Sequence, residues 1–361
     1  MELALIRKHK DLLSLKQDWD AIFAEAAVSH PFLSFEWINT WWQTMLPESM
    51  LQSHGLYVLA FYRDGTLQGV VPMFLTRYLP WLFGGLRFLR PLGSDPNLTE
   101  LKCILARPGE EQEIVRLFSQ HLLDHRRSFD SCRLPDIGID AASPVAMAAP
   151  VKVENYILAL AATWDDFKAG LKRNIKESIR KCYNAPVRQG VNLDFEAIDN
   201  REAILQHLPE YFRLHGLRAE HSDGPVHPNY FLVVQNQIFL RQLVSKLDVV
   251  RPRLLVIKHH GKIVAARFAF QMNGTMYLYF SGFEPEYGVY SVTTRLVVEC
   301  IQLGIEEGLK QINMSTGQDV SKTRWGALPV DYVNELSQSS SVRGRVIADV
   351  RRRVEALRAL K

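Results

Sequence analysis

The stretch "YLYFSGFEPEYGVYSVTTRLVVECIQLGIEEG", residues 277–308, changes character halfway along. Residues 277–283 are typical of an aromatic strand, and the apolar residues from 292 to 305 recur at helical spacing. The turn between them holds small or rigid residues: Gly282, Pro285, Gly288 and Ser291. A helix that begins Ser-Val-Thr-Thr after such a turn has two interpretations. Its N–H groups and dipole bind a phosphate, or its hydroxyl side chains cap those N–H groups.

The composition is that of a folded soluble protein. The chain has 361 residues, long enough for two domains, of which 47% are hydrophobic and 23% are charged. A net charge of +4 gives no argument for a nucleic-acid partner. The four cysteines are scattered without a C-x-x-C pair, which favours a reducing compartment and argues against structural zinc. Because the first residues carry charges and no apolar core, we expect no signal peptide and a cytoplasmic location.

Two segments resemble each other. Residues 56–75 and 253–271 each read strand, turn with glycine, strand, and aligning Gly65 with Gly261 places Gly69 on Ala265. The small residues suit close approach of a neighbouring backbone. Helical sequence precedes both hairpins, and further strand and helix follow both. We therefore predict an α/β (α+β) protein of two duplicated domains, each a mostly antiparallel mixed sheet flanked by helices.

The predicted domain limits follow breaks in the pattern. The Ala- and Pro-rich segment 140–150 lacks periodicity, so we expect one domain at 1–145 and a second at 146–340. Residues 341–361 predict a basic C-terminal helix. The polar loop 219–230, with two prolines, is a candidate neighbour of a site.

Residues 163–185 predict one helix, with Thr163 as its cap and Pro186 beyond its end. Every fourth residue is apolar, which predicts a buried stripe of Phe167, Leu171, Ile175 and Ile179. A basic row runs beside it, formed by Lys168, Lys172, Lys176 and Arg180. The row is either a solvated face or a surface for a phosphate-bearing ligand, and the sequence leaves both interpretations open.

Several motifs in the C-terminal half then occur in a recognisable order. They are "LHGLRAE" (214–220), the hairpin about Gly261, "YLYFSGFEPEYGVYS" and "INMSTGQDVSKTRWG" (312–326). This resembles the CelD-like branch of the GNAT acyltransferase superfamily, related in architecture to the twin-domain FemAB-like transferases. "HPFLSFEWINTWWQTM" (30–45) is similar to the opening of that family. The resemblance implies two tandem GNAT-like domains. The first, which lacks a counterpart of 281–291, is expected to keep the fold without the cofactor site.

The resemblance also implies an acyl-CoA site, with the thioester along the strand and the pyrophosphate at the helix start. Phosphate binding is thus the favoured interpretation of the opening stretch. The implied cofactor-binding residues are Ser281, Gly282, Phe283, Gly288, Ser291, Val292, Thr293 and Thr294. Departures occur where the family has Ser-Pro-Gly and this chain has Ser291-Val292-Thr293, and where Ser321 replaces an aromatic residue before Lys322. Backbone N–H donors survive such changes, because the side chains are not the donors.

Acyl transfer to an amine needs an oxyanion donor and groups that move protons. The candidate catalytic residues are His215, Tyr279, Glu284 and Lys322, and the candidate substrate-binding residues are Arg218, Asp319 and Trp325. Each has a structural alternative: a buried histidine that only hydrogen-bonds, an aromatic residue that packs, or a charge that faces water. Backbone N–H groups around 279–282 are the expected oxyanion donors.

The expected function is an N-acyltransferase that moves an acyl group, acetyl above all, from acetyl-CoA or another acyl-CoA to an amine, without a metal. By analogy the acceptor is a small molecule, such as an amino sugar, or a glycan- or lipid-linked amine of surface polysaccharide or lipid pathways. The alternatives are a FemAB-like transferase that uses aminoacyl-tRNA, or a catalytically silent twin-GNAT binding protein. No nucleic-acid partner is expected. The stretch 81–93 is interpreted as core packing, with peripheral membrane contact as its alternative.

Overall fold

A computed structural model describes the chain except residues 48, 79–84, 96, 136–150, 221–226 and 340–361. The chain divides into two compact units, Met1–Val153 with Tyr332–Lys361, and Glu154–Asp331. The expected limits at 145/146 fall in a segment outside the described residues, as does the predicted helix 341–361. Residues 332–339, which we expected in the second domain, group with the first unit because the chain returns to it along its last described strand.

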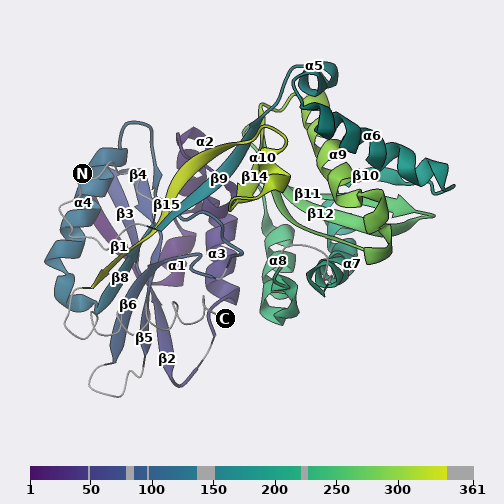
Figure 1. Ribbon diagram of the computed structural model, residues 1–361. Coiled ribbons are helices and arrows are strands. Elements are labelled where there is room, and N and C mark those ends of the chain that lie inside the picture. Colours follow the sequence, from purple (N-terminus) through teal and green to yellow (C-terminus); the bar gives the residue numbers. More distant parts are fainter. Residues whose placement is uncertain (48, 79–84, 96, 136–150, 221–226, 340–361) are drawn as a thin grey trace. The chain divides into compact units, whose positions relative to one another are not determined.

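Both units are mixed α/β, as the sequence predicts (Figure 1). In the first, one sheet has the strand order β1-β3-β4-β7 and a second has the order β2-β5-β6-β8-β15. Its elements are β1 (Glu2–Ile6), α1 (His9–Leu13), α2 (Lys16–Glu25), η1 (Pro31–Leu33), α3 (Phe35–Thr44), β2 (Gln52–Leu56), β3 (Val58–Arg63), β4 (Thr66–Val71), β5 (Met73–Tyr78), β6 (Leu86–Pro91), β7 (Leu105–Ala106), α4 (Glu111–Asp124), η2 (Arg126–Ser128), β8 (Ser131–Leu134) and β15 (Leu328–Ser339).

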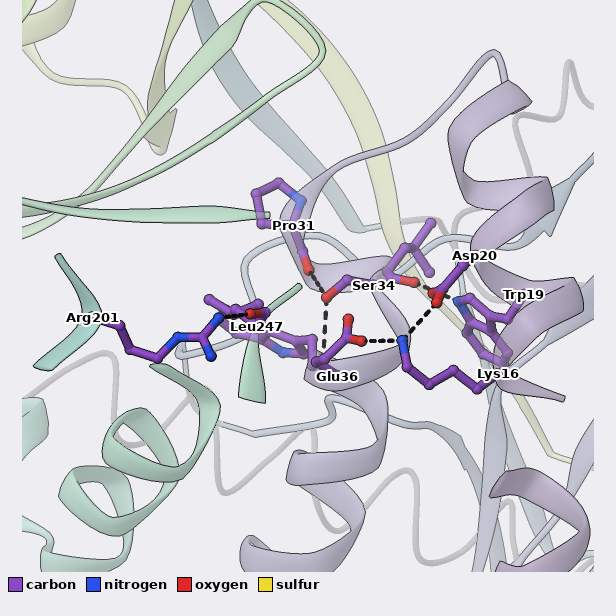
Figure 2. Close-up of polar contacts among 10 residues, drawn as sticks. Lys16, Trp19, Asp20, Pro31, Ser34, Glu36, Arg201 and Leu247 are labelled. Carbon is purple, nitrogen blue, oxygen red and sulfur yellow. Dashed lines mark hydrogen bonds and ion pairs between the residues drawn. The ribbon is translucent and has the colours of Figure 1, made fainter. Parts of the chain in front are cut away.

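The segment "HPFLSFEWINTWWQTM" forms η1 and α3 in the first unit. Ser34 begins α3 by accepting a hydrogen bond from the Trp37 amide at 3.2 Å. Lys16 on α2 pairs with Asp20 at 2.6 Å and with the buried Glu36 of α3 at 2.5 Å, as Figure 2 shows. Glu36 of this motif therefore ties α3 to α2.

The second unit contains one sheet with the order β10-β11-β12-β13-β14-β9. All its neighbouring strands run antiparallel except β13 and β14, which run parallel. Its elements are β9 (Val151–Ala159), α5 (Trp164–Ala169), α6 (Arg173–Arg188), β10 (Asp194–Ile198), α7 (Arg201–Glu220), η3 (Tyr230–Leu232), α8 (Val234–Lys246), β11 (Arg251–His259), β12 (Lys262–Met272), β13 (Thr275–Phe283), η4 (Pro285–Tyr290), α9 (Val292–Glu306), β14 (Gln311–Thr316) and α10 (Val320–Thr323).

The strand and helix predicted from 277–308 are confirmed as β13 and α9. Helices α6 and α9 lie on one face of the sheet and α7 and α8 on the other (Figure 1). Apolar side chains of β13 and α9 form the core beneath this helix, among them Leu278, Leu296 and Ile301. Because both faces are covered, the strands are apolar on both sides, and a charged residue within them is conspicuous.

The two hairpins have matching turns. Asp64 and Gly65 have φ of 50° and 75°, and His260 and Gly261 have φ of 48° and 79°. Positive φ at both central residues is what a two-residue hairpin turn requires. The predicted close approach at Gly69 is also confirmed, because a Cβ there would lie 2.6 Å from the Leu105 carbonyl oxygen.

The predicted helix 163–185 is two helices. Thr163 caps α5 as expected, accepting from the Asp166 amide at 3.1 Å, but the helix ends at Gly170 and α6 begins at Arg173. Pro186 lies inside the last turn of α6 and not beyond it. A glycine weakens a helix, and the break there still lets both helices bury the predicted apolar stripe: Phe167, Leu171, Ile175 and Ile179.

The apolar stretch 81–93 lies only partly within the described residues. In this stretch, residues 81–84 are outside the described residues, while Leu89 on β6 is buried in the first unit's core. Within the described part of the chain, no helix is both long and apolar enough to cross a bilayer.

Candidate functional site

A bulge interrupts β13 in the second unit. Ala269 of β12 pairs with Leu278, but Arg267 pairs with Ser281, so β13 carries one residue in excess between these two pairs. The rings of Tyr279 and Phe280 contact each other and lie on the side of α7, where Phe280 stacks on Tyr230. A bulge bends its strand and redirects its groups, and bulges are frequent next to active sites.

Strands β13 and β14 separate just beyond their first residues. Their parallel pairing covers only Thr275 to Tyr277 against Gln311 to Asn313. A pocket of about 300 Å³ opens in the gap. It is lined by Arg218, His227, Arg267, Leu278, Tyr279, Phe280, Ser281, Met314, Ser315, Thr316, Gly317, Gln318, Asp319, Ser321 and Lys322. The pocket therefore joins the bulge to the segment that follows β14.

Two arginines meet at Ser281 on the wall of this pocket. Arg218, near the end of α7, donates to the Ser281 hydroxyl and to the imidazole of His227, at 2.9 Å from Nε2. Arg267 of β12 donates to the same hydroxyl at 3.2 Å and to the Tyr279 carbonyl at 3.1 Å. Burial, and then the charge of Arg267, lower the pKa of Arg218 to about 10, and burial lowers that of Arg267.

Lys322 and Asp319 lie on the opposite wall, after β14. The ammonium group of Lys322 donates to the carbonyls of Thr316 and Gly317, the latter at 2.8 Å. Asp319 begins α10 by accepting from the Ser321 amide at 2.8 Å. These bonds hold the end of β14 and the turn that follows it, where Ser315 and Gly317 have positive φ. The predicted residues Tyr279, Arg218, Asp319 and Lys322 are thus brought together.

His215 lies beside the pocket and not in its lining. Its Nδ1 is 3.2 Å from the Ser281 carbonyl oxygen, and its ring packs against Phe231 and Phe280. Burial lowers the pKa of His215 to about 4, so the ring is neutral near pH 7. Nδ1 therefore donates to the carbonyl, and the geometry gives His215 a part in holding β13.

Glu284 and Trp325 are also outside the pocket lining. Glu284 pairs with Arg213 at 2.6 Å and Lys262 at 2.8 Å, and its hydrogen bond from Arg213 is the largest cause that lowers its pKa. A carboxylate held between two cations is a weak base. Trp325 is buried in the apolar core with Phe167 and Leu171, where it packs.

The expected cofactor-binding residues fall into two groups. Ser281 lines the pocket, whereas Gly282 faces α7 and Phe283 packs on the core. The other group surrounds the start of α9: Gly288 in η4, and Ser291, Val292, Thr293 and Thr294 at the first turn. Ser291 has φ of 55° and its side chain makes no capping hydrogen bond. The part of the capping alternative that assigns the cap to the Ser291 hydroxyl is therefore wrong.

The predicted basic row on α5 and α6 borders a second hollow of about 590 Å³. It is lined by Trp164, Asp165, Lys168, Ala169, Lys176, Ile179, Arg180, Tyr183, Asn184 and Gln302. Lys168 pairs with Asp165 at 2.8 Å, and Lys176 donates to the Ala169 carbonyl at 2.9 Å. Lys172, the fourth member of the row, is not part of the lining.

Sequence analysis missed His227 and Arg267 in the pocket. His227 belongs to the polar loop 219–230, which the sequence marked as a neighbour of a site without naming a residue. Arg267 carried a stronger signal, since it is the single charge in "IVAARFAF". A lone arginine inside an apolar strand needs partners in the fold, and that signal was available.

Comparison with known proteins supports the architecture. No curated protein matches the chain. Among solved structures, FemX has a TM-score of 0.58 at 10% identity, covering 94% of this chain and 97% of that chain. The C-terminal domain of a putative lysylphosphatidylglycerol synthetase from Agrobacterium fabrum has 0.51 at 10% identity, covering 95% of each chain. L-PGS from Bacillus licheniformis has 0.51 at 13% identity, covering 93% and 96%.

At these identities the likeness shows the fold alone, and nothing in these matches concerns the CelD-like branch. The family match is narrower and more specific. Residues 170–323 match the acetyltransferase (GNAT) domain, and they include the bulge, the arginine pair and the start of α9. Within the second unit, residues 170–323 are therefore similar to a GNAT-type acetyltransferase domain.

Proposed function

We propose that the chain is an N-acyltransferase that moves an acyl group, in the first place acetyl, from acyl-CoA to an amine. The observation that carries the proposal is the bulge of β13 at the point where β14 departs. An acyl thioester placed in the gap has its carbonyl beside strand backbone that the bulge has redirected. Backbone N–H groups aimed at that oxygen stabilise the oxyanion as the amine attacks.

The reaction forms a C–N bond and breaks the C–S bond, while the amine loses a proton and the thiolate gains one. His227 and Asp319 are the pocket's candidates for accepting the amine proton, since each lines it. Tyr279 is our candidate donor to the thiolate, and Lys322 our candidate for steadying charge on the opposite wall. His215 acts through Ser281, whose carbonyl it holds, and so has a positioning role.

The start of α9 is the proposed site for the CoA pyrophosphate. The first N–H groups of a helix have no partner within the helix, and the dipole favours an anion there. The Ser291 side chain does not occupy them. Gly288 does not have positive φ, so its backbone angle does not require glycine at this place.

Titration calorimetry of the full chain with acetyl-CoA and with CoA tests the proposal, together with thiol release on addition of amines. Saturable binding of both, and amine-dependent thiol release, are the expected results. Binding without transfer to any amine would leave the catalytically silent binding protein as the function. If neither acetyl-CoA nor CoA binds, the acyl-CoA proposal fails.

A second candidate, aminoacyl transfer from aminoacyl-tRNA, is favoured by the hollow beside α5 and α6. Residues 163–188 carry seven basic and three acidic side chains, and Trp164 and Tyr183 add aromatic surface. Phosphate backbones bind to such surfaces with strong salt dependence, and aromatic rings stack on bases. Tighter binding of charged tRNA than of CoA, weakened by the double change Lys176→Gln and Arg180→Gln, would establish this candidate in place of the first.

The acceptor remains the amine of an amino sugar, or of a glycan- or lipid-linked intermediate, as family analogy indicates. This part of the proposal concerns the substrate and not the reaction. Its test is transfer to glucosamine or to a lipid-linked amino sugar, with thiol release as the readout.

A further inference from the structure

The pocket between β13 and β14 has an excess of partly buried positive charge. Arg218, Arg267 and Lys322 line it, and among the described residues Asp319 is the one carboxylate in its lining. Lys322 is solvated by backbone carbonyls of its own turn, and the Asp319 carboxylate accepts from the backbone of α10. Within the described residues, neither arginine forms an ion pair with a carboxylate. Among these residues, the guanidiniums donate to neutral groups of Ser281, Tyr279 and His227.

Charge of this kind is costly to bury unless something compensates it. A purely structural role would be served as well by a neutral donor, such as glutamine, that bridges the same hydroxyl and carbonyls. Two adjacent guanidiniums also repel each other: the charge of Arg267 contributes to the lowered pKa of Arg218, and the Asp319 carboxylate offsets it only in part. An anion between them would remove both costs.

The arginines still have hydrogen-bonding capacity to offer an anion. A guanidinium has five N–H donors in a planar fork that matches carboxylate and phosphate oxygens. The bonds of Arg267 use its two terminal nitrogens, and its buried Nε has no partner among the described residues. A volume of about 300 Å³ is at the lower end for small-molecule sites and suits a compact group.

The location of the pair decides which substrate the anion belongs to. Ser281, where the arginines meet, directly follows the bulge at which the acyl carbonyl is proposed to bind. The attacking nitrogen must come within about 3.5 Å of that carbonyl carbon. A group bound at Ser281 is therefore close to the nucleophile, whereas the proposed pyrophosphate site lies beyond η4, at the start of α9.

We infer that Arg218 and Arg267 bind an anionic group of the acceptor, so that the acceptor is an amine with a carboxylate or phosphate close to its nitrogen, as in an α-amino acid or a hexosamine phosphate. The inference rests on the proposed function for the identity of the reaction, and on the pocket for the identity of the substrate class. It narrows the acceptor from amines in general to compact anionic amines.

The test compares matched ligands on the full chain by calorimetry, without any acyl donor. The probes are the proteinogenic L-α-amino acids against their α-carboxamides, and glucosamine 6-phosphate against glucosamine. At least one acid should bind about tenfold or more tightly than its neutral counterpart, the ratio expected when charge-assisted bonds are lost. Whether the first or the second pair shows this preference separates carboxylate from phosphate as the source of the anion.

Two variants localise the effect. Arg267→Gln and Arg218→Gln should each abolish the preference for the anionic member of each ligand pair. Arg218→Gln should perturb the sheet less, because Arg218 lies at the end of α7 and not in a strand. Arg241→Gln on α8, whose guanidinium covers Phe212 outside the pocket, is the matched control and should keep the preference. Circular dichroism melts report whether each variant is folded.

The outcomes separate the two proposals. Anion-dependent binding without acetyl transfer from acetyl-CoA would support the inference about the acceptor and contradict acetyl-CoA as the donor. Transfer to neutral amines as fast as to anionic ones would keep the function and overturn the inference. Equal binding of acid and amide, retention of the preference in a folded Arg218→Gln protein, or no saturable binding of any probe at millimolar concentration would each overturn it as well.

Discussion

Gly282 on β13 lies so close to His215 on α7 that a Cβ on the glycine would stand 2.2 Å from the amide nitrogen of the histidine. The neighbour is backbone, which cannot rotate away. We therefore expect Gly282→Ala to destabilise the second unit by more than the ~1–3 kcal/mol usual for overpacking. Thermal unfolding followed by circular dichroism measures it.

Gly288→Ala is the matched control for that change. A Cβ at Gly288 would be 3.4 Å from the Phe283 ring, within ordinary contact, and its φ is not positive. It should leave the melting temperature nearly unchanged. Equal stability of the Gly282→Ala and Gly288→Ala proteins would show that α7 does not press on β13.

Thr293→Asp tests the start of α9 as a pyrophosphate site. A carboxylate in the first turn is compatible with the helix dipole, so the fold should persist. It would repel a bound diphosphate, and CoA affinity should fall at least about tenfold, or about 1.4 kcal/mol. Thr293→Asn, similar in size and uncharged, should bind nearly as wild type. Unchanged affinity of a folded Thr293→Asp protein would place the pyrophosphate elsewhere.

The depressed pKa of His215 predicts loss of stability in acid. Between pH 6.5 and about 4 the unfolded chain protonates this imidazole while the folded chain does not, so stability falls as the pH falls through that window. The contribution is on the order of 3 kcal/mol when fully lost. Urea unfolding at several pH values should show a smaller acid loss for His215→Asn. Parallel pH dependence in both proteins would contradict burial of a neutral ring.

Lys322→Met tests the wall of the pocket after β14. The ammonium group holds carbonyls of a turn that contains two residues at positive φ. Loss of the ammonium group should lower the free energy of unfolding by about 1–3 kcal/mol. It should also lower kcat/KM for transfer, and by the larger fraction, because the turn borders the gap between β13 and β14. Stability from urea unfolding and kcat/KM from thiol release give the two quantities. A loss of stability with kcat/KM unchanged would make Lys322 only a structural residue.

Several elements of both units were predictable from local sequence. The aromatic strand and the helix after it are confirmed as β13 and α9, and the paired hairpins have the turns that Asp64-Gly65 and His260-Gly261 predict. These features depend on apolar period, turn chemistry and strand alternation, all of which act within about 20 residues. The match of residues 170–323 to the acetyltransferase (GNAT) domain agrees with that part of the prediction.

The helix boundaries were harder to predict. Gly170 ends α5 although the apolar stripe continues through it, and Pro186 is accommodated inside α6. The stripe predicts which residues are buried, and both short helices satisfy it equally well. Residues of α5, α6 and α9 share one core, so the stripe is buried on either side of the break and does not reveal where one helix stops and the next begins.

The candidate site divides in the same way. The sequence by itself determined the segments that meet there, since Tyr279, Ser281, Asp319 and Lys322 stand in motifs. Only the tertiary structure decided that Arg267 joins Arg218 at Ser281, that Trp325 belongs to the core, and that Glu284 is held between two cations. The physical reason is that the energy of a buried charge depends on the partners around it. Those partners come from strands and helices far apart in the chain, and only the fold brings them within hydrogen-bonding distance.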